Sequence, residues 1–375
     1  MKFAKKIHHS ILYKDPYCYL SHPHIVRVNS REILVVFNRA VRHPFILHPP
    51  VDPDFRNFVT RSFDEGNSWT EPQVVPGYEW YGMECAGLTR LLDNTILLNQ
   101  WQFLWYPLDV ALKRPDREQL TFPDAWAQEL RESAELETGF LMPPDSSDLF
   151  PWVRGNGGAY IHRSLDGGRT WEKAIKLDTR PYEGGYGMRG AVQMKNGVTL
   201  LPLCDVPNYK NIFILRSEDN GRSWSPPIYG ASLEGHFFEE PCALMLPDER
   251  ILLIFRDNVT HSLYQCFSED GGFTWDTPLP TGILGYPAHL LQLPDGRIAN
   301  VCGFRIKPYG IRILISSDQG KSWDIKNPLY LVSDLPNKNL GYPSSILLNN
   351  GQLLTVYYAE DQDGVTCIHS VTCTL

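Results

Sequence analysis

The sequence predicts an all-β fold, a six-bladed β-propeller built from four-stranded antiparallel blades. Two interleaved repeats predict it: a short turn motif that recurs five times, and a longer strand–turn–strand unit that recurs six times. The turn motif reads Ser-x-Asp-x-Gly-x-Ser/Thr-Trp, and its copies span residues 62–69, 164–171, 217–224, 268–275 and 316–323. Repeat units of about 50 residues are typical of propeller blades, because one such unit cannot bury its own face.

Each position of the turn motif has a physical role. The Asp at the start of a tight turn accepts hydrogen bonds from the turn's backbone amides, and the Gly takes the positive φ that the turn requires. The closing Trp can bury roughly 200 Å², which corresponds to about 5 kcal/mol before ordering costs. We therefore interpret the five Asp residues as structural groups of hairpin corners, not as catalytic groups.

The second repeat consists of a polar residue, a strand, a turn and a second strand. Its six copies begin at His22, Glu84, Arg189, Glu240, Tyr286 and Tyr342. Turn signals such as Asn196-Gly197 separate the two strands, as a hairpin requires. These two strands and the two that flank each corner make one four-stranded blade. Because five corners serve six blades, we expect a strand at Ile7–Tyr13 to complete the last blade beside Cys367–Leu375 and close the ring.

We predict one domain over residues 1–375, because the repeats run through the whole chain. The interval between Glu84 and Arg189 is about twice as long as a blade. Its surplus, at about Phe103–Arg154, lacks strand alternation, contains a short helical pattern at Ala125–Glu137 and is predicted to be an insertion. The insertion joins the second and third strands of its blade, so strand direction places it on the same face as the starts of the innermost strands.

Composition excludes several classes of partner and site. With a net charge of -8 and a pI of about 5.8, the chain lacks the clustered Lys and Arg on which binding to nucleic acids or anionic membranes depends. The N-terminal residues have no apolar signal-peptide core and no apolar run reaches the length of a membrane span, so we expect a soluble cytoplasmic protein. The eight Cys residues form no Cys-x-x-Cys pair, which favours reduced buried thiols and predicts neither disulfides nor a metal site.

Strand direction also sorts the polar residues onto two faces. If each innermost strand starts at the top of the propeller, the second strand ends there too, and the corners lie underneath. The six residues that open the innermost strands then surround the central axis on one face, and we call them the rim. The ends of the second strands add Arg39, Asp205, Arg256, Arg305 and Tyr358. Because the rim residues are all polar and combine acids, cations and phenols, we interpret this face as the functional site.

At these residues the sequence resembles the sialidase superfamily, whose members are six-bladed propellers with the Ser-x-Asp-x-Gly-x-Thr-Trp corner, the Asp-box or BNR repeat. The order of residues in the last three blades carries the resemblance. Glu240 opens a blade, Arg256 and Arg305 close second strands, and Gly341-Tyr342 opens the sixth blade. The resemblance implies that Tyr342 is a nucleophile assisted by Glu240, and that the two Arg residues bind a carboxylate.

The chain departs from the family pattern in its first blade. Where the family has an Arg, this sequence reads Leu20-Ser-His22-Pro-His24, so the third carboxylate-binding Arg is absent. The family's acid/base Asp lies in the loop after the second strand of that blade, where this sequence offers Asp52 and Asp54. The resemblance implies cleavage of a terminal carboxylated sugar, sialic acid or another, with one of these Asp residues as proton donor and with no cofactor.

The same chemistry can be argued from the residue types. Tyr has a pKa near 10, so it needs a base such as Glu240 to act as a nucleophile at neutral pH. A neutral phenol avoids the repulsion of about 4 kcal/mol that a charged nucleophile would meet at about 4 Å from a substrate carboxylate, for an effective dielectric near 20. The leading hypothesis is a retaining exo-glycosidase for an acidic sugar. Its predicted substrate-binding residues are Arg256, Arg305, Arg189, Arg39, His22, His24, Glu84, Tyr286 and Glu239.

Two other functions fit the same residues. A polysaccharide lyase acting next to a uronate could use His22 or His24 as base and a Tyr as acid, and its product would absorb ultraviolet light through a new double bond. A non-catalytic sugar-binding propeller would bind its ligand without turnover, which the missing Arg of the first blade favours.

Overall fold

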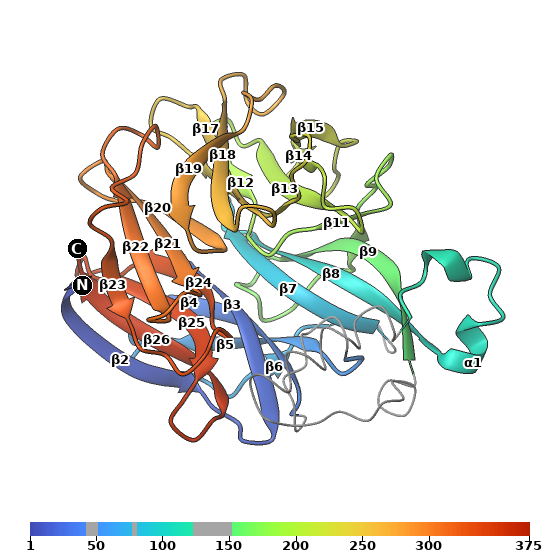
Figure 1. The fold of residues 1–375 in the computed structure, drawn as a ribbon, viewed down its shortest axis with the longest axis horizontal. Coiled ribbons are helices and arrows are strands. Elements are labelled where there is room, and N and C mark those ends of the chain that lie inside the picture. Colours follow the sequence, from blue (N-terminus) through green and yellow to red (C-terminus); the bar gives the residue numbers. More distant parts are fainter. Residues whose placement is uncertain (43–51, 77–80, 123–151) are drawn as a thin grey trace.

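The computed structural model describes residues 1–42, 52–76, 81–122 and 152–375, and these residues form six small antiparallel sheets arranged around a central axis (Figure 1). Within each sheet the strands follow one another outward in sequence order, except that the N-terminal strands β1 and β2 lie at the outer edges of the last two sheets. The predicted six-bladed β-propeller is therefore confirmed.

Blades one to three use four strands each, except that the innermost strand of blade three is split in two. These strands are β3 (Cys18–Asn29), β4 (Glu32–Val41), β5 (Arg56–Ser62) and β6 (Gln73–Val74); β7 (Tyr81–Arg90), β8 (Ile96–Pro107), β9 (Trp152–Ser164) and β10 (Ile175–Lys176); and β11 (Gly184–Tyr186), β12 (Val192–Gln193), β13 (Thr199–Val206), β14 (Ile212–Ser217) and β15 (Ile228–Ala231).

Blades four to six repeat the pattern, and the last blade takes its outer strand from the start of the chain. Their strands are β16 (Phe238–Met245), β17 (Ile251–Asp257), β18 (Ser262–Ser268) and β19 (Leu279–Leu284); β20 (Ala288–Gln292), β21 (Ile298–Phe304), β22 (Gly310–Ser316) and β23 (Leu329–Val332); and β24 (Gly341–Leu347), β25 (Leu353–Glu360), β26 (Thr366–Thr374) and β2 (Lys5–Tyr13).

The two ends of the chain close the ring. β2 pairs antiparallel with β26, with Ser10 opposite Ser370 and their hydroxyl oxygens 2.7 Å apart. The short strand β1 (Lys2–Phe3) extends blade five by pairing in parallel with β23. The termini consequently lie side by side in Figure 1. The predicted closure of the last blade by an N-terminal strand is confirmed, and it leaves blade six without a free β26 edge.

The core consists of apolar side chains packed between neighbouring blades. Between blades one and two, for example, Leu34 and Val36 of β4 pack with Leu88 of β7 and Leu98 of β8. Such burial on both faces of a blade explains the near-continuous apolar runs of the second strands. The Cys residues whose side chains are described are free and buried, as the sequence predicts.

Blade two has longer strands than the sequence predicts. β8 continues through Phe103 to Pro107, and β9 begins at Trp152, so both ends of the predicted insertion are strand. Phe103 and Trp105 are only 1% and 8% exposed, which shows that aromatic residues alternate into the core and continue the strand. After β8 the chain forms α1 (Leu108–Ala111) and a 3-10 turn at Arg117–Gln119. The helix predicted at residues 125–137 lies outside the described residues.

The innermost strand of blade three does not begin at Arg189 as predicted. Arg189 lies between β11 and β12, which pair with the two halves of β13. The break brings the backbones of blades two and three together, because a Cβ at Gly190 would lie 2.3 Å from the carbonyl oxygen of Leu88. Only a glycine fits such an approach.

The five corners have one geometry, which the corner of blade two illustrates. Asp166 accepts hydrogen bonds from the amides of Arg169 and Thr170 at 3.0 and 2.9 Å and from the hydroxyl of Ser164 at 2.7 Å. Burial alone would raise the pKa of Asp166, but these hydrogen bonds outweigh it and lower the pKa. The corner Gly168 has a φ of +84° and contacts Leu34 of the preceding blade.

The corners lie on the face opposite the rim. Ser62, which starts the first corner, pairs with Ile33 at the start of β4, far from His22. The Trp side chains are less buried than predicted: four are half-buried, and Trp323 is buried. The close approach of each corner Gly to a Leu of the neighbouring blade therefore adds to the burial that the Trp provides.

Asp166→Ala is expected to lower the free energy of unfolding by about 1 to 3 kcal/mol, because the turn loses several hydrogen bonds at once. Thermal melting measures this loss, and activity per folded molecule should not change. Glu218→Ala is the matched control, since Glu218 is an exposed residue of the next corner that precedes its Asp. An Asp166→Ala protein that is fully stable but inactive would contradict the structural role.

Candidate active site

Three rim residues occupy the same unusual backbone conformation. His22, Glu240 and Tyr342 have positive φ values of 50°, 59° and 50°, and each lies in a bulge of the innermost strand of its blade. A non-glycine residue in this region costs about 1 to 3 kcal/mol and persists only where the surrounding structure imposes it. The bulge turns the side chain out of the regular alternation of the strand. Strain at the same place in three blades makes this face the candidate active site.

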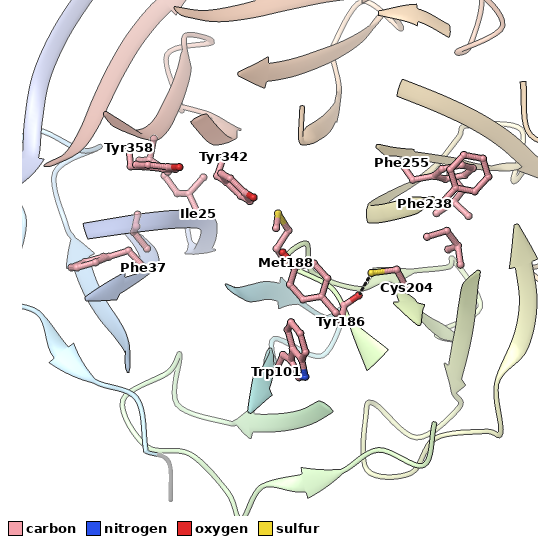
Figure 2. Close-up of a cluster of buried hydrophobic side chains, with 14 of the residues drawn as sticks. Ile25, Phe37, Trp101, Tyr186, Met188, Cys204, Phe238, Phe255, Tyr342 and Tyr358 are labelled. Carbon is pink, nitrogen blue, oxygen red and sulfur yellow. Dashed lines mark hydrogen bonds between the residues drawn. The ribbon is translucent and has the colours of Figure 1, made fainter. Parts of the chain in front are cut away.

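Tyr342 and Glu240 meet across the axis. The Tyr342 hydroxyl donates a hydrogen bond of 2.6 Å to Oε1 of Glu240, and the two residues are 4% and 1% exposed. This is the approach that the sequence predicts for a nucleophile and its base. In Figure 2 the Tyr342 hydroxyl points toward the middle of the ring of blades. The same Glu240 oxygen lies 3.4 Å from a terminal nitrogen of Arg256.

The two predicted arginines share one aromatic ring. The guanidinium carbon of Arg256 lies 4.0 Å from the centre of the Tyr286 ring, and that of Arg305 lies 5.4 Å from the same centre. Arg305 also donates two hydrogen bonds, of 3.1 and 2.9 Å, to the carbonyl oxygen of Leu340. Burial alone would lower the pKa of Arg256, but Glu240 and Glu239 outweigh it, so both arginines remain cations.

Glu239 reaches the same cation as Glu240. Its Oε1 lies 3.5 Å from Arg256 and accepts a hydrogen bond from the side-chain amide of Asn258. Burial and the adjacent Glu240 carboxylate raise the pKa of Glu239. The site therefore contains two neighbouring carboxyl groups whose environments differ, because only one of them receives the Tyr342 hydroxyl.

His22 begins a chain of buried side-chain hydrogen bonds that crosses into blade two. Its Nδ1 lies 3.0 Å from Oδ1 of Asn38, whose Nδ2 donates to Oδ1 of Asn57 at 2.8 Å. Nδ2 of Asn57 then donates to Gln100 at 2.8 Å, and Gln100 continues to His162 at 2.7 Å. Sequence reasoning missed these amides, although polar residues inside apolar second and third strands are a signal that could have revealed them.

This series of hydrogen bonds determines which ring nitrogen of His22 carries the proton. Nδ2 of Asn38 also donates to the carbonyl oxygen of Met83 at 3.2 Å, which fixes the orientation of the amide. Oδ1 of Asn38 therefore faces His22, and Nδ1 of His22 carries a hydrogen. The His22 ring packs edge-on against Tyr342, with the ring centres 4.1 Å apart. His22 is thus held in one orientation beside the predicted nucleophile.

A second polar group lies on the blade-two side of the rim. Burial lowers the pKa of Arg154, and the nearby Tyr209 and Glu84 oppose this effect. Burial and the carboxylates of Glu239 and Glu84 raise the pKa of Tyr209 well above its usual value. Glu84 was predicted, whereas Arg154 and Tyr209 were missed. Arg154 is the last residue of the predicted insertion, and only the fold brings it near Glu84.

Two predicted binding residues, His24 and Arg189, are buried near the central axis and contact neighbouring blades. His24 accepts a hydrogen bond from the backbone amide of Leu88 at 3.1 Å, and its ring centre lies 5.6 Å from that of His289. Burial and the charge of Arg189 lower the pKa of His24 to about 3, so this imidazole is neutral at pH 7. Arg189 donates from Nε to the carbonyl oxygen of Ala288 at 2.8 Å. His24 and Arg189 thus contribute to packing between blades.

The remaining predicted residues come from blade one. Arg39 pairs with Asp15 at 2.9 Å and with the sulfur of Cys18 at 3.2 Å. Asp54 is exposed, and Asp52 is buried with its Oδ1 accepting the amide of Asp54 at 2.8 Å. The loop between Arg42 and Asp52 lies outside the described residues.

The described residues 1–42, 52–76, 81–122 and 152–375 bring no group of three or more His, Cys, Asp and Glu side chains into a metal-binding arrangement. Over the same ranges, no helix has the length and apolar character needed to cross a membrane.

Solved structures with similar folds include proteins of several activities. A crystal structure of a protein of unknown function from Dyadobacter fermentans DSM 18053 has a TM-score of 0.78 and 24% sequence identity, covering 98% of this chain and 99% of that one. The NanB sialidase from Streptococcus pneumoniae has a TM-score of 0.68 and 14% identity, covering 98% of this chain and 70% of that one. An alpha-L-arabinanase from Penicillium chrysogenum has a TM-score of 0.60 and 13% identity, covering 97% of both chains. At these identities the likeness is one of fold.

Sequence comparison identifies the family. The photosystem II assembly protein Ycf48 from Synechococcus sp. (strain JA-3-3Ab) is 45% identical over 56 residues, which are 15% of this chain and 16% of that protein. The chain thus matches about a sixth of the length of this curated relative. Residues 140–355 match the model of the BNR repeat-like domain. This match covers more than half of the chain and shows that the chain belongs to the BNR repeat-like family, in agreement with its six blades and their repeated corners.

Proposed function

We propose that the chain is a retaining exo-glycosidase that removes a terminal carboxylated sugar. The observation that carries this proposal is the hydrogen bond of 2.6 Å from the Tyr342 hydroxyl to Glu240. A phenol that donates to a carboxylate has a base in place for the loss of its proton. Tyr342 is the nucleophile and Glu240 the base in this mechanism.

A carboxylated sugar suits the charges around this pair. Both arginines lie near this pair: Arg256 is 3.4 Å from Glu240, and the Arg305 guanidinium is 5.6 Å from the centre of the Tyr342 ring. Arg256 faces Glu239 and Glu240, whereas the hydrogen bonds of Arg305 go to neutral groups, the carbonyl of Leu340 and the hydroxyl of Tyr358. The charge of Arg305 is therefore the one available to a substrate carboxylate. A single Arg–carboxylate contact contributes about 1.5 to 3 kcal/mol, or roughly ten- to a hundredfold in affinity.

The residue at the start of the first blade bears on the choice of substrate, because it is a histidine and not an arginine. His22 occupies the position of the family's Arg, and Asn38 fixes its ring, so this blade offers an imidazole in place of a guanidinium. An imidazole beside a sugar suits a hydroxyl or a weaker contact with the carboxylate. The proton donor for the leaving oxygen is one of the carboxyl groups on this face, Asp52, Asp54 or Glu239.

One observation favours a second candidate, a lyase that acts next to a uronate. The His22 ring lies 4.1 Å from the Tyr342 ring, so a base and a phenolic acid are adjacent. In that reaction His22 removes a proton from the carbon next to the carboxylate, and Tyr342 protonates the leaving oxygen.

Turnover of a panel of acidic glycosides tests the proposal. The panel contains α- and β-linked aryl and disaccharide glycosides of sialic acids and of uronic acids. Release of the terminal sugar with retained configuration, seen by proton NMR of the first-formed anomer, supports the proposed function. An ultraviolet-absorbing product identifies a lyase. Binding measured by calorimetry without any turnover of the panel overturns both enzymatic functions.

A further inference from the structure

The placement of Glu239 and Glu240 on one arginine requires a distorted strand. Successive side chains of a strand point to opposite faces of the sheet. Yet Oε1 of Glu239 and Oε1 of Glu240 lie 3.5 and 3.4 Å from the same nitrogen of Arg256. The bulge between Glu239 and Cys242, together with the φ of 59° at Glu240, brings the two carboxyl groups together. The backbone strain thus produces a pair of acids that a regular strand would separate.

Two carboxyl groups that share one cation hold one proton between them, because two adjacent negative charges are not both balanced by Arg256. The charged member is Glu240, since its Oε1 accepts both the Tyr342 hydroxyl and Arg256. Glu239 is the more open of the two, with a side chain 14% exposed against 1% for Glu240. The protonated carboxyl is therefore the one that substrate can reach.

The other groups around Glu239 are consistent with a protonated acid. Arg305 favours the charged form of Glu239, whereas burial and Glu240 favour the neutral form and prevail. On the blade-three side Tyr209 and Cys204 lie near Glu239, and burial raises the pKa of both, so neither carries a positive charge that would favour the ionised carboxyl. Asn258 donates to Oε1 of Glu239, so the proton of the acid form lies on Oε2.

We infer that Glu239 is the proton donor to the leaving oxygen, in place of Asp52 or Asp54, and that Glu239 and Glu240 act as a one-proton pair on Arg256. This inference rests on the proposed function. In the first step the Tyr342 oxygen bonds to the anomeric carbon and its proton passes to Glu240. The bond from the anomeric carbon to the leaving oxygen breaks, its electron pair goes to that oxygen, and the oxygen takes the proton of Glu239.

In the second step the proton movements reverse. A water oxygen bonds to the anomeric carbon and gives a proton to the Glu239 carboxylate. The bond to the Tyr342 oxygen breaks, and that oxygen recovers its proton from Glu240. The pair carries a single negative charge in the free enzyme, in the covalent intermediate and after hydrolysis. Arg256 consequently balances the same charge throughout, and no charge has to be created or removed in this buried site.

Glu239→Gln tests the inference through its dependence on the leaving group. The measured quantity is kcat/KM, which reports formation of the intermediate, for a 4-nitrophenyl glycoside and for an alkyl glycoside of the same sugar. With the alkyl glycoside kcat/KM should fall by about 10²- to 10⁴-fold, the usual contribution of a general acid. With the nitrophenyl glycoside, whose leaving group needs no proton, it should fall less than about tenfold. Azide should trap the intermediate of this variant as a glycosyl azide.

Two further variants separate the possible outcomes. Glu240→Gln should lose activity toward both substrates, because the base is needed whatever the leaving group. Glu234→Gln changes an exposed residue that precedes blade four and is the matched control with unchanged activity. The inference is overturned if Glu239→Gln lowers kcat/KM equally for both substrates. It is also overturned if Asp52→Asn, and not Glu239→Gln, lowers kcat/KM mainly for the alkyl glycoside. In either case the glycosidase function stands. A wild-type protein that turns over no acidic glycoside overturns the proposed function and this inference with it.

Discussion

Tyr342→Phe is expected to lower kcat on an acidic glycoside by about 10³-fold or more, because the change deletes the nucleophilic oxygen. The ring itself should stay in place. It is held edge-on against His22 with the ring centres 4.1 Å apart, and the Arg305 guanidinium lies 5.6 Å from its centre. Binding of substrate should therefore change little, so that kcat falls while the dissociation constant of a non-hydrolysed substrate analogue is preserved.

Tyr358→Phe is the matched control for this change. Tyr358 is also a buried phenol of blade six, and its ring centre lies 5.8 Å from that of Tyr342. Tyr358 lies in the second strand of its blade, β25, and its hydroxyl is 3.5 Å from a nitrogen of Arg305, so its loss should lower kcat less than about tenfold. Near-full turnover by Tyr342→Phe would contradict the assignment of Tyr342 as the nucleophile. Loss of turnover in Tyr358→Phe alone would assign that role to Tyr358.

The propeller was predictable because its signals are local. The Asp of each corner must accept amide hydrogen bonds within a few residues, and Gly168 must take a φ of +84°, so the sequence of the turn reports its own geometry. Closure by the N-terminal strand followed from counting corners against blades. The ends of β8 and β9 were wrong because alternation of Phe103 and Trp105 was read as loop, although both side chains are buried.

The site was only partly predictable, because its residues depend on contacts between blades. Strand order placed Glu240 and Tyr342 on one rim, but the φ of 59° that brings Glu239 beside Glu240 leaves no mark in the sequence. A regular strand would have sent the two side chains to opposite faces. Arg39 was predicted to bind substrate because it lies at the end of a second strand. In the structure it forms an ion pair of 2.9 Å with Asp15.

Arg256→Leu is expected to lower the free energy of unfolding at pH 7 by about 3 to 5 kcal/mol, because it leaves two carboxyl groups without their cation. Their oxygens lie 3.5 and 3.4 Å from Arg256 in the intact site. Turnover should fall as well, since Glu240 without a neighbouring cation is harder to keep charged. Melting temperature and kcat on the same preparation measure the two effects.

The pH dependence of this loss separates a charge effect from a packing effect. Without Arg256 the pKa values of the folded carboxyl groups rise above their unfolded value of about 4.3, so the folded state holds protons that the unfolded state releases. The deficit relative to the wild type should therefore be small at low pH, grow as the pH rises above about 4.3, and level off once both groups have ionised in the fold.

Arg305→Ala is the control, because Arg305 donates to the neutral carbonyl of Leu340. It should weaken binding of a carboxylated ligand, and its stability deficit should grow less with pH than that of Arg256→Leu, because Arg305 acts on Glu239 more weakly than Arg256 does. If the loss in free energy of unfolding for Arg256→Leu stays constant from pH 4 to pH 8, Arg256 acts by packing on Tyr286. That result would contradict the interpretation that Glu239 and Glu240 share Arg256 as their cation.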